Sequence, residues 1–540
     1  KKLERKMILK RFLSNLKDNK KVISINKSNL LKYENSWPTN DEILKIEEKK
    51  EQLVPLVNHL RSIIKTRGPL SVHDYMAQAL NNIEYGYYQQ NSIKIGSKGD
   101  FITSPEISSI FCELIGVWCV ASWEAMGSPP KLNLVELGPG KGTLMKEILK
   151  VSQNFPYFKK AISVHMVEVS EVMRNIQRKA LLPELSENNI DYSAISSTSP
   201  PVDTSKGVAF NGVPIHWHNL LREVPSTQSV YLGHEILDAF PVHQFAKLDG
   251  KWRELLVDVD FTENSKYHFR FVRSSIITPG LNVFFNKNRT EVSLRPLTKL
   301  FDPVESPIPT TSTTTSTIPT TTTITTIIQT PTPTPTIPIS MSSTKQTIPP
   351  LNSSSKTQEL ILTDKPQKIS STTKDEEEKT VIDHALYDPK LDSLEVSPLA
   401  FALIEEISRR VLKEKSVSLL VDYGENYPQG DTLRGFKEHK AAHVLSEPGQ
   451  VDISADVNFK ACAQIAKEIG ASVQGPITQK EFLGKMGIVE RLESIVEKEN
   501  FTEEELDRLF SSTEKVATGL MGEKFKFISI VHPSITTPGF

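Results

Sequence analysis

The sequence is poor in cysteine, lacks a long apolar run and carries almost no net charge. Its three cysteines, Cys112, Cys119 and Cys462, form no CxxC pair or His/Cys cluster, which argues against a zinc site and a disulfide framework. Cys112 and Cys119 lie in an apolar run and are expected to be small buried residues on one helix face. A net charge of −1 gives no support for a nucleic-acid partner, and no stretch is long enough for stable membrane insertion.

The first 31 residues differ from the rest of the chain in charge. They contain ten Lys or Arg and only two acids, and Leu9, Phe12, Leu13 and Leu16 follow helical spacing. A basic, amphipathic and acid-poor segment is typical of a mitochondrial presequence, and a disordered basic arm is the alternative. Because the first residue is Lys, the sequence is expected to begin inside a longer precursor.

Four regions follow one another along the chain. Residues 1–50 are polar and basic and are expected to be poorly ordered, whereas residues 51–302 alternate strand-like and helix-like runs. Residues 303–384 are rich in Thr, Ser and Pro and are expected to form a disordered insertion that is dispensable for folding. Foldable sequence resumes at about residue 385 and continues through 385–540.

Periodicity predicts alternating strands and helices on both sides of the insertion. Strands are expected over 132–137, 162–169, 229–233, 418–421 and 524–532, with a hairpin over 242–258 that turns at Asp249-Gly250. Helices are expected from Thr143 as cap, over 171–182, and from Ser397-Pro398 with an apolar stripe at 399, 403, 407 and 411. This alternation predicts an α/β fold with a mostly parallel sheet and a ligand at the carboxyl ends of its strands.

A glycine-rich turn follows the first of these strands. The run 136–142 reads ELGPGKG, so its glycines are two residues apart behind an acid, whereas dinucleotide-binding folds use GxGxxG. Glycine lets the backbone approach a ligand closely. S-adenosyl-L-methionine has no phosphate but carries an ammonium and a sulfonium, which suits an acidic neighbour. We therefore predict a site for this cofactor at Glu136, Gly138, Gly140, Gly142 and Thr143.

The second predicted strand ends near Glu168, whose carboxylate is placed to accept hydrogen bonds from both ribose hydroxyls of the cofactor. An ordinary tight strand-to-helix turn and a nicotinamide-dependent enzyme remain alternatives for the glycine loop. The loop and Glu168 together favour a class I methyltransferase.

Six sequence blocks carry a family resemblance. They are Gly99–Ser108, Glu136–Met145, Val167–Ser170, Asp238–Phe245, Gly430–Phe436 and Gly475–Gln479. Together they resemble the MidA-like mitochondrial proteins, a family of complex I assembly-factor protein arginine methyltransferases. The resemblance covers most of residues 51–302 and 385–540 and omits the insertion.

The resemblance implies a class I S-adenosyl-L-methionine methyltransferase (Rossmann-like) fold. It assigns an N-terminal helical cap and the methyltransferase core to 51–302, and the rest of the domain with added substrate-binding segments to 385–540. It also implies the mitochondrial matrix as location and symmetric dimethylation of an arginine in a core subunit of respiratory complex I. Where the family usually has Asn-Glu, this sequence has His234-Glu235, and the charge of this histidine is expected to depend on pH near neutrality.

Arginine methylation makes particular demands on a site. A guanidinium is a poor nucleophile because it is protonated and its lone pairs are delocalised. Carboxylates are needed to bind the parallel N–H groups of the guanidinium and to bias its charge so that the attacking nitrogen becomes more nucleophilic. Glu235 and Asp238 follow a predicted strand, so we predict Glu235 as the guanidinium clamp and Asp238 as a second catalytic acid. For Asp238, capping of the next helix or turn is the alternative.

The segment around Thr103 and Ser104 is predicted to close over the cofactor. It also has the pattern of a helix start, with Ser104 as cap and Pro105 at the first helical position, and both interpretations are compatible.

Roles can also be predicted for four further residues. Arg434, His439 and His443 are expected to be substrate-loop or surface groups, since the two histidines lack the Glu of a zincin motif and no metal is expected. Trp217 is expected to be a buried core aromatic, with the border of the adenine pocket as the alternative.

Three functions compete on this evidence. A protein arginine methyltransferase acting in respiratory-complex assembly is favoured. An enzyme with the same cofactor and an RNA or small-molecule substrate is disfavoured by the near-neutral charge and the lack of an Asn-Pro-Pro-Tyr-type motif. A non-catalytic assembly scaffold is disfavoured by the intact glycine loop and Glu235.

Overall fold

The computed structural model describes residues 55–89, 102–182, 205–262, 265, 267–285, 390–497 and 501–540. All of them belong to one compact unit, whose two chain segments precede and follow Pro303–Lys379 in the sequence. The predicted N-terminal arm, the predicted disordered insertion and the block Gly99–Phe101 lie outside the described residues.

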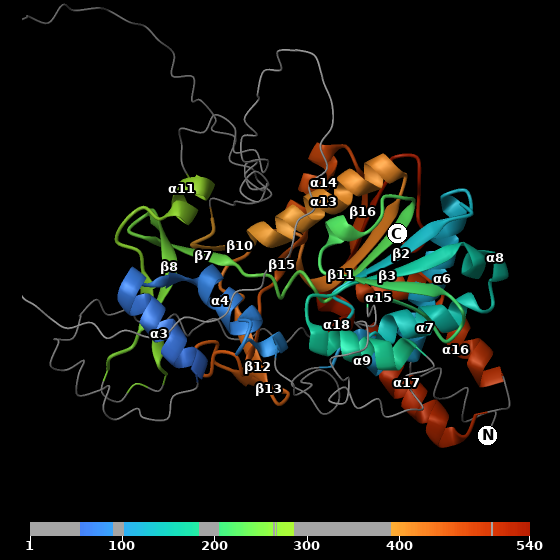
Figure 1. Ribbon diagram of the computed structural model, residues 1–540, viewed down its shortest axis with the longest axis horizontal. Coiled ribbons are helices and arrows are strands. Elements are labelled where there is room, and N and C mark those ends of the chain that lie inside the picture. Colours follow the sequence, from blue (N-terminus) through green and yellow to red (C-terminus); the bar gives the residue numbers. More distant parts are fainter. Residues whose placement is uncertain are drawn as a thin grey trace, which may run out of the picture. The chain divides into compact units, whose positions relative to one another are not determined.

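The largest sheet of this unit has nine strands and lies on the right in Figure 1. Its order is β16 (Ser472–Thr478), β17 (Phe525–Val531), β11 (Val417–Glu425), β6 (Ser229–His234), β2 (Leu132–Leu137), β3 (Ile162–Val167), β5 (Pro214–His218) and β4 (Lys206–Val208), with β15 (Val457–Asn458) beside β11. Strands β5, β3, β2, β6 and β11 pair in parallel, which confirms the predicted sheet. Strand β17 runs antiparallel between β11 and β16.

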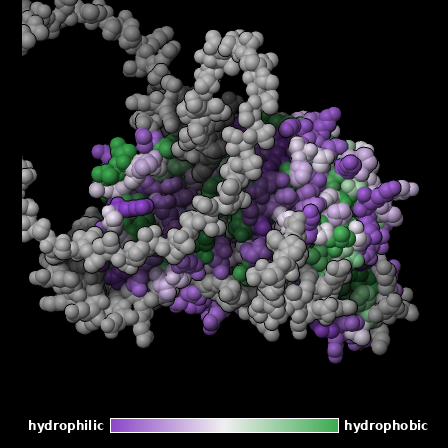
Figure 2. Space-filling model, viewed as in Figure 1, coloured by the Kyte–Doolittle hydropathy of each residue, from purple (hydrophilic) through white to green (hydrophobic). Residues whose placement is uncertain are grey.

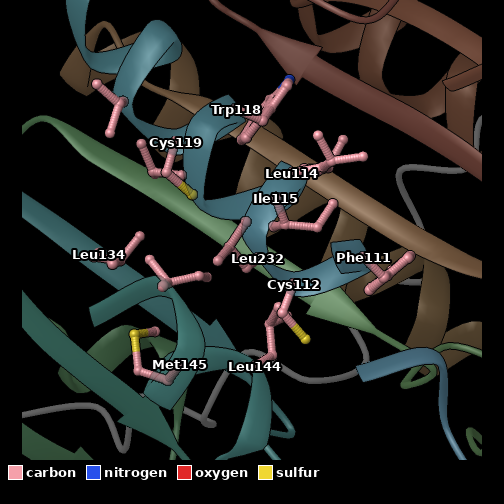
Figure 3. Packing of buried hydrophobic residues seen from close by; sticks show 14 of the residues in the cluster. Phe111, Cys112, Leu114, Ile115, Trp118, Cys119, Leu134, Leu144, Met145 and Leu232 are labelled. Carbon is pink, nitrogen blue, oxygen red and sulfur yellow. The ribbon is translucent and has the colours of Figure 1, made fainter. Parts of the chain in front are cut away.

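The two faces of this sheet bury alternate residues of each strand, because successive side chains point in opposite directions. Leu134 and Leu232 belong to a core shared with α6 (Ser109–Ala125) and α7 (Thr143–Ser152), as Figure 3 shows. Val135 and Tyr231, their sequence neighbours, belong to a second core shared with α13 (Pro398–Glu414) and α14 (Phe459–Ile469). Helices therefore cover the sheet on both faces, as the predicted α/β class requires.

Helix α6 supplies a large share of the first core. Cys112 and Cys119 are both fully buried on it, which confirms their predicted role as small core residues. The remaining helices of the sheet region are α5 (Ser104–Ile107), α8 (Pro156–Ala161), α9 (Glu171–Leu181), α15 (Gln479–Lys485), α16 (Ile488–Glu497), α17 (Glu503–Ala517), α18 (Gly519–Lys524) and the short η3 (Leu221–Glu223).

A smaller sheet and the N-terminal helices form a third core. Its strands are β1 (Leu70–Ser71), β7 (His243–Leu248), β8 (Lys251–Val259), β9 (Phe269–Arg273) and β10 (Ser393–Val396). Helices α3 (Pro55–Arg67) and α4 (Val72–Asn81) bury Leu60 and Tyr75 in that core with Val257. The expected hairpin is confirmed, because β7 and β8 pair around Asp249 and Gly250, both left-handed. Helix α11 (Pro279–Phe285), η1 (Tyr87–Gln89) and the sheet of β12 (Arg434–Lys437), β13 (Lys440–Ala442) and β14 (Asp452–Ser454) complete the unit.

Two predicted helix details are wrong. Gly142, with φ +80°, caps α7, and Thr143 is its first helical residue. Likewise Thr103 caps α5, and Ser104 is the first residue of that helix. In both cases the chain turns one residue earlier than predicted, so the residue assigned as cap already has helical geometry.

No helix within the described ranges is long and apolar enough to span a bilayer. Where described residues form the surface in Figure 2, that face is mainly hydrophilic, with small and separate hydrophobic areas.

Candidate active site

A cavity of about 550 Å³ lies at the carboxyl ends of β2, β3 and β6, a size typical of small-molecule sites. Seven of the ten predicted site residues line it: Thr103, Glu136, Gly138, Gly140, Thr143, Glu168 and Glu235. Ser104, Gly142 and Asp238 are next to lining residues in the sequence but do not line the cavity themselves.

The glycine loop has a backbone that other residues rarely adopt. Gly138, Gly140 and Gly142 all have positive φ, at +60°, +51° and +80°. A Cβ on Gly138 would come within 3.0 Å of Ile236, whereas a Cβ on Gly140 would meet no protein atom within 4 Å. The space beside Gly140 therefore belongs to the cavity. Gln177 Nε2 donates to the Gly140 carbonyl over 2.7 Å and fixes the loop to α9.

Glu136 is a buried acid in the wall of this cavity. Only 3% of its surface is exposed, and burial raises its pKa to about 8. Among the residues that the structure describes, its Oε2 atom has no hydrogen-bond partner. A buried carboxylate without a partner is costly, so a cationic ligand group is expected to complete this position.

Glu168 directly follows β3 and also lines the cavity. Its Oε1 accepts the Ser170 N–H over 2.8 Å, and its Oε2 accepts Gln177 Nε2 over 3.3 Å. Burial raises its pKa in spite of these donors. Gln177 also accepts a hydrogen bond from Trp217, which is buried in the core and does not line the cavity, as expected.

These features fit S-adenosyl-L-methionine. The orphaned Glu136 oxygen suits its ammonium, Glu168 offers a carboxylate for ribose hydroxyls, and Gly140 leaves room for close approach. Val169 and Leu220 follow the ends of β3 and β5, and both are apolar yet exposed, at 62% and 41%. They line the same cavity and provide apolar surface for a flat base.

Glu235 lies just beyond β6 and faces the cavity. Its φ is +53°, a left-handed value that is strained for a non-glycine residue. Its Oε1 accepts the Ser104 N–H over 3.4 Å and lies 3.5 Å from His234 Nδ1. Burial, and next the charge of Asp238, raise its pKa well above the ordinary value.

The expectation of a pH-dependent His234 is wrong. The residue lines the cavity and packs edge-on against Phe111, with ring centroids 5.4 Å apart. Burial lowers its pKa to about 3, so the ring is neutral near pH 7.

Asp238 belongs to an acidic cluster behind Glu235, together with Asp422 and Asp456. Burial raises its pKa to about 6, although Arg434 opposes that rise. The backbone of Ala239 and the carboxyl of Asp422 also lower its pKa, so Asp238 interacts both with its own turn and with a neighbouring acid. The predicted alternative is that Asp238 caps the next helix or turn. The structure places it in a turn, and no helix follows directly, so only the helix part of that alternative is not supported.

The interpretation of Arg434 as a loop or surface group is wrong. It begins strand β12, pairs with Asp456, and holds its guanidinium carbon 4.3 Å from the centre of the Tyr423 ring. His439 lies exposed in the turn between β12 and β13, as expected of a surface group, whereas His443 is partly buried and stacks on Tyr267 with ring centroids 4.2 Å apart. Within the described ranges no group of three or more His, Cys, Asp or Glu is placed to hold a metal.

Some walls of the cavity were not predicted. Tyr88 in η1 lines it and donates from Oη to Asp452 over 3.1 Å. Helix α13 contributes Leu399, Ala402, Leu403 and Glu406. Leu399 and Leu403 had been assigned to the core stripe of this helix, and their incomplete burial shows that this face borders the cavity instead.

Comparisons with known proteins agree with this geometry. Residues 114–318 and 340–477 match the model of a family described as putative S-adenosyl-L-methionine-dependent methyltransferases. The chain is 31% identical to the mitochondrial protein arginine methyltransferase NDUFAF7 of Xenopus tropicalis, over 89% of this chain and 86% of the relative. The human protein of the same name is 32% identical over 90% and 85%.

The chain belongs to this family of methyltransferases. A likely methyl transferase of Burkholderia thailandensis, crystallised with S-adenosyl-homocysteine, shares the fold. The two structures superpose with a TM-score of 0.56 at 18% sequence identity, and the match covers 93% of this chain and 97% of that chain. The enzyme therefore uses S-adenosyl-L-methionine as its cofactor, as predicted. When bound, this cofactor supplies a methyl group already activated on a sulfonium.

Proposed function

We propose that the enzyme methylates an arginine of a protein substrate in the mitochondrial matrix. The observation that carries this proposal is the set of carboxylates next to the cofactor loop. Glu235 and Glu106 both line the cavity beside the glycine loop, and the charges of Asp238 and Asp452 act on Glu235 from behind by raising its pKa. A guanidinium is the protein side chain that best matches such a group.

In this proposal Glu235 is the clamp and Asp238 the second acid. The substrate guanidinium favours the ionised form of Glu235, which burial alone disfavours. Its carboxylate then orients the fork and draws positive charge away from the attacking nitrogen. The bound cofactor would supply the methyl group, and the methylated nitrogen would have to lose one proton, which the ionised carboxylate of Glu235 or Asp238 would accept.

The names of the relatives support the more specific part of the proposal, which concerns the substrate and the product. These relatives are named mitochondrial protein arginine methyltransferases, and the name NDUFAF7 is consistent with complex I assembly. We infer that the target is a core subunit of respiratory complex I and that the product is symmetric dimethylarginine. Both inferences rest on family similarity rather than on the cavity.

The experiment is a transfer assay with methyl-labelled cofactor and purified complex I core subunits as substrates. Label on arginine, with symmetric dimethylarginine after acid hydrolysis, is the expected result. Glu235→Gln is expected to lower kcat by about 100-fold or more, as loss of a transition-state contact does, while the cofactor Kd changes little. If folded wild-type protein binds the cofactor and still labels only RNA or lysine, the arginine assignment is wrong. If it labels nothing while assembly depends on it, a scaffold is the better account.

A further inference from the structure

The turn that carries Glu235 has an unusual support. Glu235 is left-handed, and its own N–H donates to the Val421 carbonyl over 2.9 Å. The next three backbone N–H groups, of Ile236, Leu237 and Asp238, all point at one oxygen, Asp422 Oδ2, over 3.0, 2.7 and 3.3 Å.

Asp422 is a fully buried residue of β11, the strand beside β6. Its other oxygen, Oδ1, accepts the Tyr423 N–H over 2.7 Å, so four backbone donors surround one carboxylate. Successive N–H groups that converge on one point form a concave site for an acceptor, and here a side-chain oxygen of the same chain fills that site. Buried N–H groups without such an acceptor are costly, so the turn depends on this carboxylate.

Left-handed geometry at a non-glycine residue costs roughly 1–2 kcal/mol and persists only where the surroundings enforce it. Two contacts with β11 hold Glu235 in this geometry. Its own N–H donates to the Val421 carbonyl, and the N–H of Leu237, two residues later, donates to Asp422. This backbone orients the Glu235 side chain towards the Ser104 amide and the cavity.

We propose that Asp422 is the positioning residue of the active site. It folds the turn 235–238 so that the Glu235 carboxylate faces the cavity, and it acts on catalysis through Glu235 without lining the cavity itself. This inference rests on the proposed role of Glu235 in methyl transfer.

The test compares Asp422→Ala and Asp422→Asn with Ser418→Ala, a control on the same strand. Ser418 is fully buried, and its hydroxyl donates to the Ile530 carbonyl and accepts the Ile530 N–H, so the control also loses two hydrogen bonds of β11 but leaves the turn untouched. Three readouts are taken on each protein: amide hydrogen exchange at 236–238, the cofactor Kd, and kcat and KM for the arginine substrate.

In Asp422→Ala, exchange at 236–238 is expected to rise about 10-fold or more, in line with the loss of a buried acceptor. The kcat is expected to fall about 100-fold, as misplacement of a catalytic group does, while the cofactor Kd stays within about threefold because Glu136 and the glycine loop are intact. Asp422→Asn keeps one carbonyl oxygen and should give intermediate values. Ser418→Ala should lower thermal stability and leave all three readouts near wild type.

Unchanged exchange at 236–238 in a folded Asp422 variant would overturn the inference. The inference would also be overturned if kcat and cofactor affinity fell together in the Asp422 variants and Ser418→Ala, at equal stability, showed the same losses. If Asp422→Ala does not fold, Asp422→Asn decides the question. If wild-type enzyme methylates no arginine, the exchange data still report the turn, so failure of the proposed function is told apart from failure of this inference.

Discussion

The ammonium of Lys141 lies 3.3 Å from the carboxylate of Glu106 and joins the glycine loop to α5. Both residues line the cavity, so the ion pair bridges two of its walls. A partly exposed pair of this kind contributes little stability, about 1 kcal/mol at most. We infer that the pair restrains separation of these two walls, since each wall supplies one partner.

We expect Lys141→Ala to speed release of the cofactor by about twofold to fivefold, because the loss of one partly exposed ion pair has this size. Stopped-flow displacement measures the rate. Raising the salt concentration should shrink the difference between variant and wild type. A difference that does not depend on salt would contradict the ionic explanation.

Gly140→Val is expected to abolish detectable cofactor binding by calorimetry, with Kd raised by about 100-fold or more. The substitution strains a left-handed backbone and places methyl groups in space that belongs to the cavity. Gly212→Val is the matched control, because Gly212 has φ +87°, also has no atom near its missing Cβ, and does not line the cavity. Equal loss of binding in both variants would assign the effect to strain alone.

Glu136→Gln should change how stability depends on pH. Burial raises the pKa of Glu136 from 4.5 to about 8, so between these values the folded protein binds a proton that the unfolded chain has released. Wild-type stability without cofactor therefore falls as pH rises through this window, by up to about 1.4 kcal/mol per pH unit from this group. The variant should lack this contribution, as urea unfolding at several pH values would show.

The exposed Glu490 gives the control for that experiment, because Glu490→Gln should leave the wild-type slope unchanged. Cofactor affinity should follow the opposite trend, since an ionised Glu136 favours the ammonium: it should rise with pH towards 8 in wild type. Weak, pH-independent binding is expected in Glu136→Gln. A variant with the wild-type pH slope would show that Glu136 does not titrate in this range.

His234→Asn should leave the pH profile of kcat between pH 5 and 8 unchanged, because burial already keeps this histidine neutral there. Asparagine restores the residue usual in the resembled family and can still hydrogen-bond. Steady-state rates across this range measure the effect. A new or shifted acid limb in the variant would show that His234 does take up a proton.

Local patterns predicted much of the fold. The apolar run 132–137, the glycines behind it and the alternating strands predicted the parallel sheet and the edge at which the cavity lies. The glycine loop and Glu168 were also assigned to the cavity from sequence. These features depend on neighbours in the chain, which is why periodicity and spacing reveal them.

Contacts between distant segments were not predictable in the same way. The roles of Tyr88, Asp422 and Leu403 depend on which elements meet across the sheet, and a helical stripe looks the same whether it faces a core or a cavity. The neutral state of His234 follows from burial, which no single-sequence pattern reports.

The pairing of β6 with β11 has a consequence for how the protein is made. Because synthesis starts at the N-terminus, the glycine loop, Glu168 and Glu235 are made long before Asp422, α13 and strand β17. The cofactor site can therefore be completed only near the end of synthesis. Strands β2, β3, β5 and β6 can pair with one another before then, but the outer edge of β6 lacks β11. Such non-local pairing slows folding and exposes an unpaired strand edge, so the edge of β6 is a place where the newborn chain needs protection from aggregation.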